Sequence, residues 1–205
     1  SHPRYLFLMG KSIKSKNSRK NAVAFVENLV PSFGNPASDN MLTSGLNGTN
    51  REPLLPTGRL AAKNGIEVDW YLNKISQHEN PPPISPTNSN EWMKRALHFG
   101  GGSTVSEALG FMANLNIYKN TFEDTLFGGN VISFSKSSTA PIQNALSDSI
   151  KNYIGQGVAL MTFFGHASAT GGFDQNIQDP QYWYPQNGKY PLLLGLSCFT
   201  GDIHG

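Results

Sequence analysis

The chain has 205 residues, of which 38% are hydrophobic and 15% charged, and its basic and acidic residues nearly cancel to a formal charge of +2. That length and apolar content suffice for a sizeable core, in one large domain or in two closely associated ones. The balanced charge argues against nucleic acid as a partner, and no segment approaches the roughly 20 consecutive apolar residues that cross a membrane.

Residues 1–85 are predicted to form the C-terminal part of a first α/β subdomain. The apolar run in RYLFLMG predicts a strand over residues 4–10, and apolar positions at helical spacing predict a helix over residues 18–30. Residues 31–58 are rich in Pro, Ser, Asn and Gly, and are expected to form a long loop region. A second helix is expected within residues 55–80, after a short entry.

The proline-rich segment PPPISPTNSN can be neither helix nor central strand, so we place a subdomain boundary there. Residues 91–205 beyond it alternate between apolar runs and helical periodicity. We predict strands over 95–102, 129–135, 157–164 and 190–197, and helices over 104–116 and 140–156. This order is typical of an α/β fold with a mainly parallel sheet flanked by helices. The last two strands are nearly continuously apolar, and are expected to be central neighbours in a sheet with one side uncovered or capped by another chain.

Two reactive side chains directly follow the last two predicted strands. His166 comes after GVALMTFF and Gly165, and Cys198 comes after YPLLLGLS. Because ligands gather at the carboxyl ends of parallel strands, adjacent strands would bring the histidine and the thiol into one crevice. A thiolate nucleophile and an imidazole that exchanges protons are the groups that thiol catalysis needs. The alternative is that His166 only ends a strand and Cys198 is a small buried hydrophobe.

The motifs around these residues form an ordered set. FFGHAS and LSCFTGDI lie about thirty residues apart, and SDN, PTGRLAAKN, KISQHEN and EWMKRALHFGGG precede them in that order. Together they resemble the gingipain-type cysteine peptidases, peptidase family C25, whose catalytic domain has the caspase-like fold. The resemblance extends from about residue 5 to the end of the chain.

The resemblance implies a cysteine endopeptidase that works through a Cys-His dyad and an acyl-enzyme. Cys198 matches the nucleophile, His166 matches the catalytic histidine, and the backbone N–H groups of Ala167 and Cys198 match the oxyanion site. A protein or peptide would be the substrate, no cofactor is expected, and structural calcium is left open. The protein would be secreted, or lie on the outer cell surface, after type IX secretion. The competing interpretation is an inactive caspase-like structural or binding module of a larger secreted protein.

The chain departs from the family pattern at three points. Ala167 stands where many members have glycine. Arginine-specific gingipains carry an acidic residue directed at the histidine just after the strand that matches ALHFGGG, where this chain has residues 100–102, all glycine. Glu107 is expected to lie too far along to replace it. The sequence ends seven residues after Cys198, so we expect a catalytic domain truncated after the cysteine strand, without full activity.

Other conspicuous residues receive simpler interpretations. Cys198 and His204 lack a second CxxC or HxxxH pattern, so no zinc site is predicted. His78 is expected on a helix surface and His98 within a strand. The GGGS segment lacks the lysine of a phosphate-binding loop and is interpreted as strand-end geometry. The loop between the histidine and cysteine strands is expected to pack on the domain and to border the crevice; its conspicuous residues are Asp174, Asp179, Tyr182 and Trp183.

Overall fold

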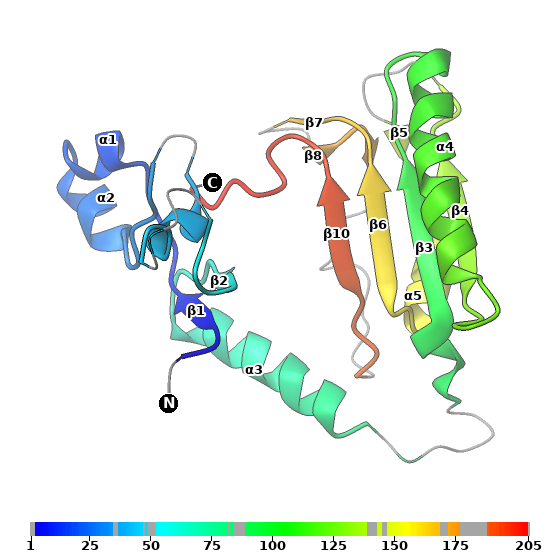
Figure 1. Cartoon of the computed structure of the whole chain (residues 1–205), viewed down its shortest axis with the longest axis horizontal. Coiled ribbons are helices and arrows are strands. Elements are labelled where there is room, and N and C mark those ends of the chain that lie inside the picture. Colours follow the sequence, from blue (N-terminus) through cyan, green and yellow to red (C-terminus); the bar gives the residue numbers. More distant parts are fainter. Residues whose placement is uncertain are drawn as a thin grey trace. The chain divides into compact units, whose positions relative to one another are not determined.

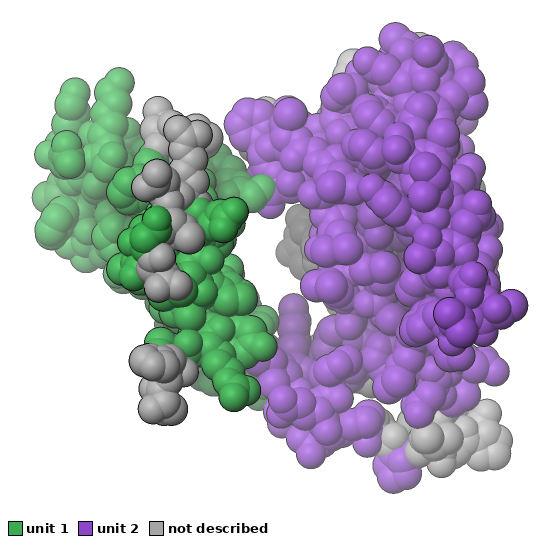
Figure 2. Space-filling view, in the orientation of Figure 1, with its two compact units in different colours: residues 1–73, 201–205 green, residues 74–200 purple. Residues whose placement is uncertain are grey.

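The computed structural model divides the chain into two compact units. One consists of residues 1–73 with 201–205, and the other of residues 74–200 (Figure 2). The division falls within α3 (Gly65–Glu79), ahead of the proline-rich segment in which the sequence predicts a subdomain boundary. The structure describes residues 3–34, 37–46, 48, 52–81, 83, 89–138, 143–144, 147–168, 172–176 and 188–204. Within these ranges, no helix combines the length and the apolar character that crossing a membrane requires.

The first unit contains a two-stranded parallel sheet, formed by β1 (Leu6–Met9) and β2 (Thr57–Leu60). The strand predicted over residues 4–10 is therefore confirmed as β1. The second strand is missing from the sequence prediction, because its four residues include Gly58 and Arg59 and show no apolar alternation. A 3₁₀ turn over Asp39–Leu42 lies in the intervening region.

The helix predicted over residues 18–30 is wrong in extent. The structure has two shorter helices there, α1 (Ser15–Ser18) and α2 (Ala22–Glu27). The Asn21 side chain accepts hydrogen bonds from the N–H groups of Val23 and Ala24, so a new helix begins at Asn21. At the other end, the Asn28 side chain accepts from Ile13 N at 2.9 Å, outside the helix. Local amide hydrogen bonds thus override the apolar periodicity.

A buried arginine ties the first unit together. The guanidinium of Arg59 forms a bidentate pair with Asp39, at 2.6 Å from Nε to Oδ2 and 2.8 Å from Nη2 to Oδ1. Its Nη1 also donates to the carbonyls of Gly10 and Val30, at 2.6 and 2.7 Å. Only 3% of the Arg59 side chain is exposed. One side chain therefore joins β2, the end of β1, the end of the helical segment and the 3₁₀ turn.

The second unit contains a four-stranded, wholly parallel sheet with the order β10-β6-β3-β4 (Figure 1). All four strands are predicted from the sequence. Their bounds are β3 (Arg95–Gly100), β4 (Asn130–Ser135), β6 (Leu160–Phe164) and β10 (Leu192–Leu196). A 3₁₀ turn over Asn90–Lys94 precedes β3. The predicted α/β class, with a mainly parallel sheet flanked by helices, is confirmed.

Helices cover both faces of this sheet. On one face, Leu97 and Phe163 belong to a buried cluster with Ile154 of α5 (Ser147–Gln156). On the opposite face, the ring of Phe164 packs against that of Phe111 in α4 (Val105–Phe122), with 4.8 Å between centroids. Successive strand residues face opposite sides, which accounts for the near-continuous apolar runs.

Two pairs of two-residue strands lie near the carboxyl end of the sheet (Figure 1). β5 (Gln143–Asn144) pairs in parallel with β9 (Gln175–Asn176), and β7 (Ala167–Ser168) pairs antiparallel with β8 (Gly172–Phe173). The helix predicted over 140–156 is confirmed over Ser147–Gln156 and is wrong at residues 143–144, which form β5, while residues 140–142 and 145–146 lie outside the described residues.

The two strands expected to be central neighbours are neighbours, but only one of them is inner. β6 lies between β3 and β10, whereas β10 forms an edge among the described strands. All five residues of β10 are exposed, including 63% of Leu192. Its apolar run therefore predicts the strand correctly, but not its burial. The sequence predicts that one side of the sheet is uncovered, and among the described residues this is the edge that β10 forms.

We predict that Arg59→Met destabilises the first unit by about 3–5 kcal/mol, because it leaves the carboxylate of Asp39 buried without its partner. Hydrogen exchange of the Gly10 amide, which donates to Leu60 O across β1 and β2, should accelerate by about 10²-fold or more. Arg4→Met, which removes an exposed arginine from the same unit, is the matched control. Equal exchange in both variants would show that the Arg59 contacts do not hold the unit.

Candidate active site

His166 and Cys198 lie beyond the same edge of the sheet. His166 is two residues past Phe164, the last residue of β6, and Cys198 is two residues past Leu196, the last residue of β10. Phe164 and Leu196 are register partners in adjacent parallel strands. The N–H of Gly165 also donates to Leu196 O at 3.4 Å, so backbone contact continues past the paired residues.

The chain turns sharply at Cys198. Phe199 has a φ of 59°, a left-handed conformation that bulky side chains rarely adopt. The hydroxyl of Thr200 donates to Ser197 O at 2.8 Å and closes the turn. Cys198 is exposed, so it is not the small buried hydrophobe that the sequence leaves open as an alternative.

Glu107 contacts the ring of His166, which corrects the expectation that it lies too far along the chain. Its Oε2 lies 3.3 Å from His166 Nε2, and the two side chains are 43% and 47% exposed. Phe111, one helical turn further along α4, packs edge-on against the same ring with 5.5 Å between centroids. An ionised carboxylate only accepts hydrogen bonds, so Nε2 is the donor in this contact and Nδ1 is the unprotonated nitrogen of the neutral ring.

Reciprocal hydrogen bonds at the start of α4, resembling a capping box, hold Glu107 in place. Thr104 is the N-cap of α4 and accepts from Glu107 N at 3.2 Å, while Glu107 Oε2 accepts from Ser103 N at 2.9 Å. The Ser103 N–H, followed by the His166 side chain, holds the pKa of Glu107 below its usual value. The T-x-x-E spacing is a sequence signal from which this fixed carboxylate could have been found.

Ala167 occupies a position compatible with its predicted role in the oxyanion site. The N–H of Asp174 donates to His166 O at 2.8 Å, which makes these two residues a hydrogen-bonded pair of the β7–β8 hairpin. Hydrogen-bonded and non-hydrogen-bonded pairs alternate in an antiparallel ladder. Ala167, paired with Phe173, therefore directs its N–H away from β8. The oxyanion assignment of Ala167 and Cys198 stays a prediction.

The remaining singled-out histidines make other contacts. His98 is buried in β3, and burial lowers its pKa. His78 lies on α3 and packs edge-on against Trp92. His204 Nε2 lies 3.0 Å from Ser32 Oγ within the first unit. Among the residues that the structure describes, no three His, Cys, Asp or Glu side chains gather as a metal site would require. The predicted loop residues Asp179, Tyr182 and Trp183 lie outside the described residues.

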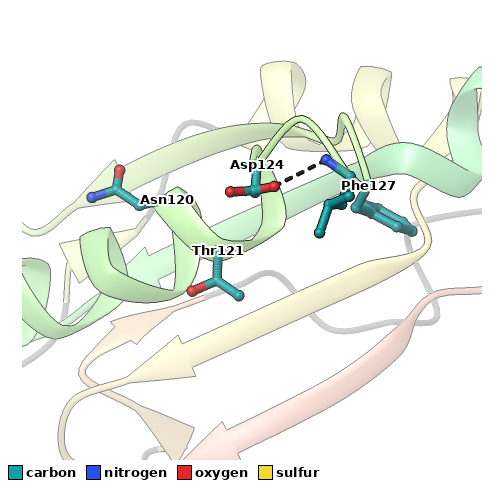
Figure 3. Close-up of a pocket in the computed structure, with 5 residues that line it drawn as sticks. Asn120, Thr121, Asp124 and Phe127 are labelled. Atoms are coloured by element: carbon teal, nitrogen blue, oxygen red, sulfur yellow. Dashed lines mark hydrogen bonds between the residues drawn. The ribbon is translucent and has the colours of Figure 1, made fainter.

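A surface pocket of about 390 Å³ lies at the other end of α4 (Figure 3). It is lined by Asn120, Thr121, Asp124, Leu126 and Phe127. Asp124 accepts from Leu126 N at 2.9 Å, the hydrogen bond drawn in the figure, and thereby shapes the turn that follows the helix. Because α4 starts after the carboxyl end of β3 and leads to the amino end of β4, this pocket and His166 belong to opposite edges of the sheet.

Comparisons with known proteins agree with the fold. A family model described as Peptidase family C25 matches residues 1–204. A crystal structure of the Arg-specific cysteine proteinase gingipain R (RgpB) is similar with a TM-score of 0.59 and 16% identity, over 98% of this chain and 41% of that one. A complex of the pro- and mature domains of Porphyromonas gingivalis RgpB is similar at 0.59 and 17%, over 98% and 42%. The chain thus spans about two fifths of these structures. The comparison with curated proteins found no match.

We predict that His166→Ala raises the pKa of Glu107 toward the ordinary value of 4.5, because one of the contacts that favour the carboxylate is lost. A ¹³C titration of the Glu107 carboxyl measures this, with the signal assigned through Glu107→Gln. In the wild type the lowered pKa means that the capping contact is complete above about pH 4.5 and is lost as the pH falls through the folded value.

Glu67 provides the internal control for this titration. It caps α3 in the same way, accepting from Lys63 N at 2.8 Å while its own N–H donates to Asn64, and it has no histidine among these contacts. At neutral pH, the chemical shift of its carboxyl carbon should be the same with and without His166→Ala. A Glu107 midpoint that stays in place would mean that the 3.3 Å contact is not formed in solution.

Proposed function

The chain belongs to peptidase family C25, and we propose that it carries the dyad of a cysteine endopeptidase, with Cys198 as nucleophile and His166 as proton carrier. The observation that supports this most strongly is the register of β6 and β10, which pairs Phe164 with Leu196 and so leads both reactive residues to one edge. The exposed thiol and the Glu107 contact at His166 add to it.

In the proposed reaction, His166 Nδ1 takes the thiol proton and the sulfur of Cys198 attacks the carbonyl carbon of the substrate peptide bond. Negative charge develops on the carbonyl oxygen, where the N–H groups of Ala167 and Cys198 stabilise it. The imidazolium then gives its proton to the leaving amine as the C–N bond breaks. Water, deprotonated by His166, attacks the resulting thioester and releases the new carboxylate.

Glu107 has two roles in this proposal. Its hydrogen bond at Nε2 fixes the ring orientation and selects the tautomer in which Nδ1 is the base. Its negative charge also favours the imidazolium that forms when the thiol is deprotonated. A half-exposed carboxylate can do this without the desolvation cost that a buried one would carry.

The substrate is a protein or a peptide. The peptidase itself acts outside the cell, either secreted or on the outer cell surface, after type IX secretion. The support for this location is the resemblance to gingipain-type peptidases. The second candidate function is a non-catalytic caspase-like module of a larger secreted protein. The exposed leucine-rich edge of β10 favours it, since such an edge can bind another segment.

Alkylation kinetics separate the two functions. We predict that iodoacetamide modifies native Cys198 at about pH 6.5 faster than it modifies a free-thiol peptide, because a paired thiolate reacts quickly. His166→Ala should slow the reaction at least about tenfold, while His78→Ala, which removes an exposed histidine of the same unit, should not. If native Cys198 reacts no faster than the peptide, and His166→Ala changes nothing, the non-catalytic module is the better description.

A further inference from the structure

One carboxylate contacts three of the loops that leave the carboxyl edge of the sheet. Asp174, which directly follows β8, accepts from His166 N through Oδ1 at 3.1 Å and from Gly102 N through Oδ2 at 2.7 Å. Lys136 Nζ, beyond the end of β4, lies 3.6 Å from the same Oδ2. The extensions of β3, β4 and β6 therefore converge on Asp174.

Asp174 holds both backbone polar groups of His166. Its side chain accepts from the His166 N–H, and its own N–H donates to His166 O at 2.8 Å. Glu107, by contrast, is hydrogen-bonded to the imidazole of His166 and not to its backbone. The ring and the backbone of His166 are thus fixed by two different carboxylate residues, from α4 and from the β8–β9 segment.

Two glycines make room for this carboxylate. A Cβ on Gly165 would lie 2.7 Å from Asp174 Oδ1 and 2.8 Å from Gly101 Cα, and a Cβ on Gly101 would overlap the Asp174 carboxylate. This explains why a glycine stands between the end of β6 and the histidine. It also gives a physical reason for Gly101 after β3, which the sequence shows only as strand-end geometry.

The pair formed with Lys136 is buried. The side chains of Lys136 and Asp174 are 0% and 7% exposed, and Lys136 Nζ makes no hydrogen bond to the described part of the chain. Removing one partner of a buried ion pair leaves an uncompensated charge and destabilises a protein strongly. A loss of stability must therefore be separated experimentally from any effect on His166.

We propose, building on the proposed peptidase function, that Asp174 is a positioning residue that fixes the His166 backbone so that the ring meets Glu107 and the thiol of Cys198, with Lys136 as its counter-charge. An amide at position 174 offers one acceptor oxygen in place of two, so it cannot hold both His166 N and Gly102 N. The consequence is a misplaced imidazole and not only a weaker fold.

The test compares Asp174→Asn with the double variant Asp174→Asn/Lys136→Met in the full chain. The double variant also removes the lysine charge that Asp174→Asn leaves without its counter-charge, so it should regain most of the lost thermal stability. The double variant should not restore the native position of the His166 ring. The Glu107 carboxyl midpoint should rise in both variants, as in His166→Ala, and alkylation of Cys198 should be roughly tenfold to hundredfold slower in both. Asp148→Asn, at an exposed position in α5, is the matched control.

Recovery of the Glu107 midpoint and of the alkylation rate together with stability would overturn the proposal, as would an unchanged midpoint in Asp174→Asn. If the variants do not fold, hydrogen exchange in the unmutated protein decides: unprotected amides at His166 and Gly102 contradict the proposal, and protected ones support it. Failure of the peptidase proposal is a separate result. It would appear as an unreactive Cys198 in the wild type, while the Glu107 titration still reports the effect of Asp174.

Discussion

Parallel pairing leads the chain out of β3, β6 and β10 at the same edge, and the candidate site depends on that constraint. The ladder extends one residue beyond the strands, since Gly101 N donates to Phe164 O and Gly165 N to Leu196 O. The backbone pairing alone therefore confines the residues that follow two neighbouring strands to a small region. No contact between their side chains is needed for this. A thiol and an imidazole on such supports need little further ordering when a substrate binds.

The two carboxylates beside His166 differ in environment, and the difference suits their roles. Glu107 is half exposed and contacts a ring that must change charge during the proposed reaction. Asp174 is buried against backbone N–H groups and a lysine, contacts that do not change as protons move. A solvated carboxylate tolerates a partner that changes charge, whereas a buried one is suited to holding groups that do not.

The sequence predicts the strands well because all four strands of the larger sheet combine apolar runs with flanking glycine or turn residues. It predicts helix limits less well, because side-chain caps decide them. Asn21 starts α2 inside the single helical pattern of residues 18–30, and residues 143–144, within the second predicted helix, pair as β5 instead. The burial of β10 is also misjudged, since a leucine run indicates a strand but cannot show whether a neighbour covers it.

Within the site, the positions of His166 and Cys198 follow from strand order alone, whereas the contacts of Glu107 and Asp174 do not. Glu107 is brought to the histidine by the turn at Gly102, whose φ of 139° lets α4 begin close to the sheet edge. Asp174 reaches its partners through a hairpin of two-residue strands, for which the sequence carries almost no signal. Contacts made by short irregular segments depend on tertiary structure that local patterns do not encode.

The close packing of Gly101, Gly165 and Asp174 also limits how this edge can change during evolution. A methyl group at either glycine needs the space that the carboxylate of residue 174 occupies. A larger residue at position 101 therefore requires a smaller side chain at position 174, which would lose the contacts with His166. A larger residue at position 165 would in addition require the backbone at Gly101 to shift. The three positions are therefore coupled sterically, so the substitutions that one of them tolerates depend on the residues at the other two.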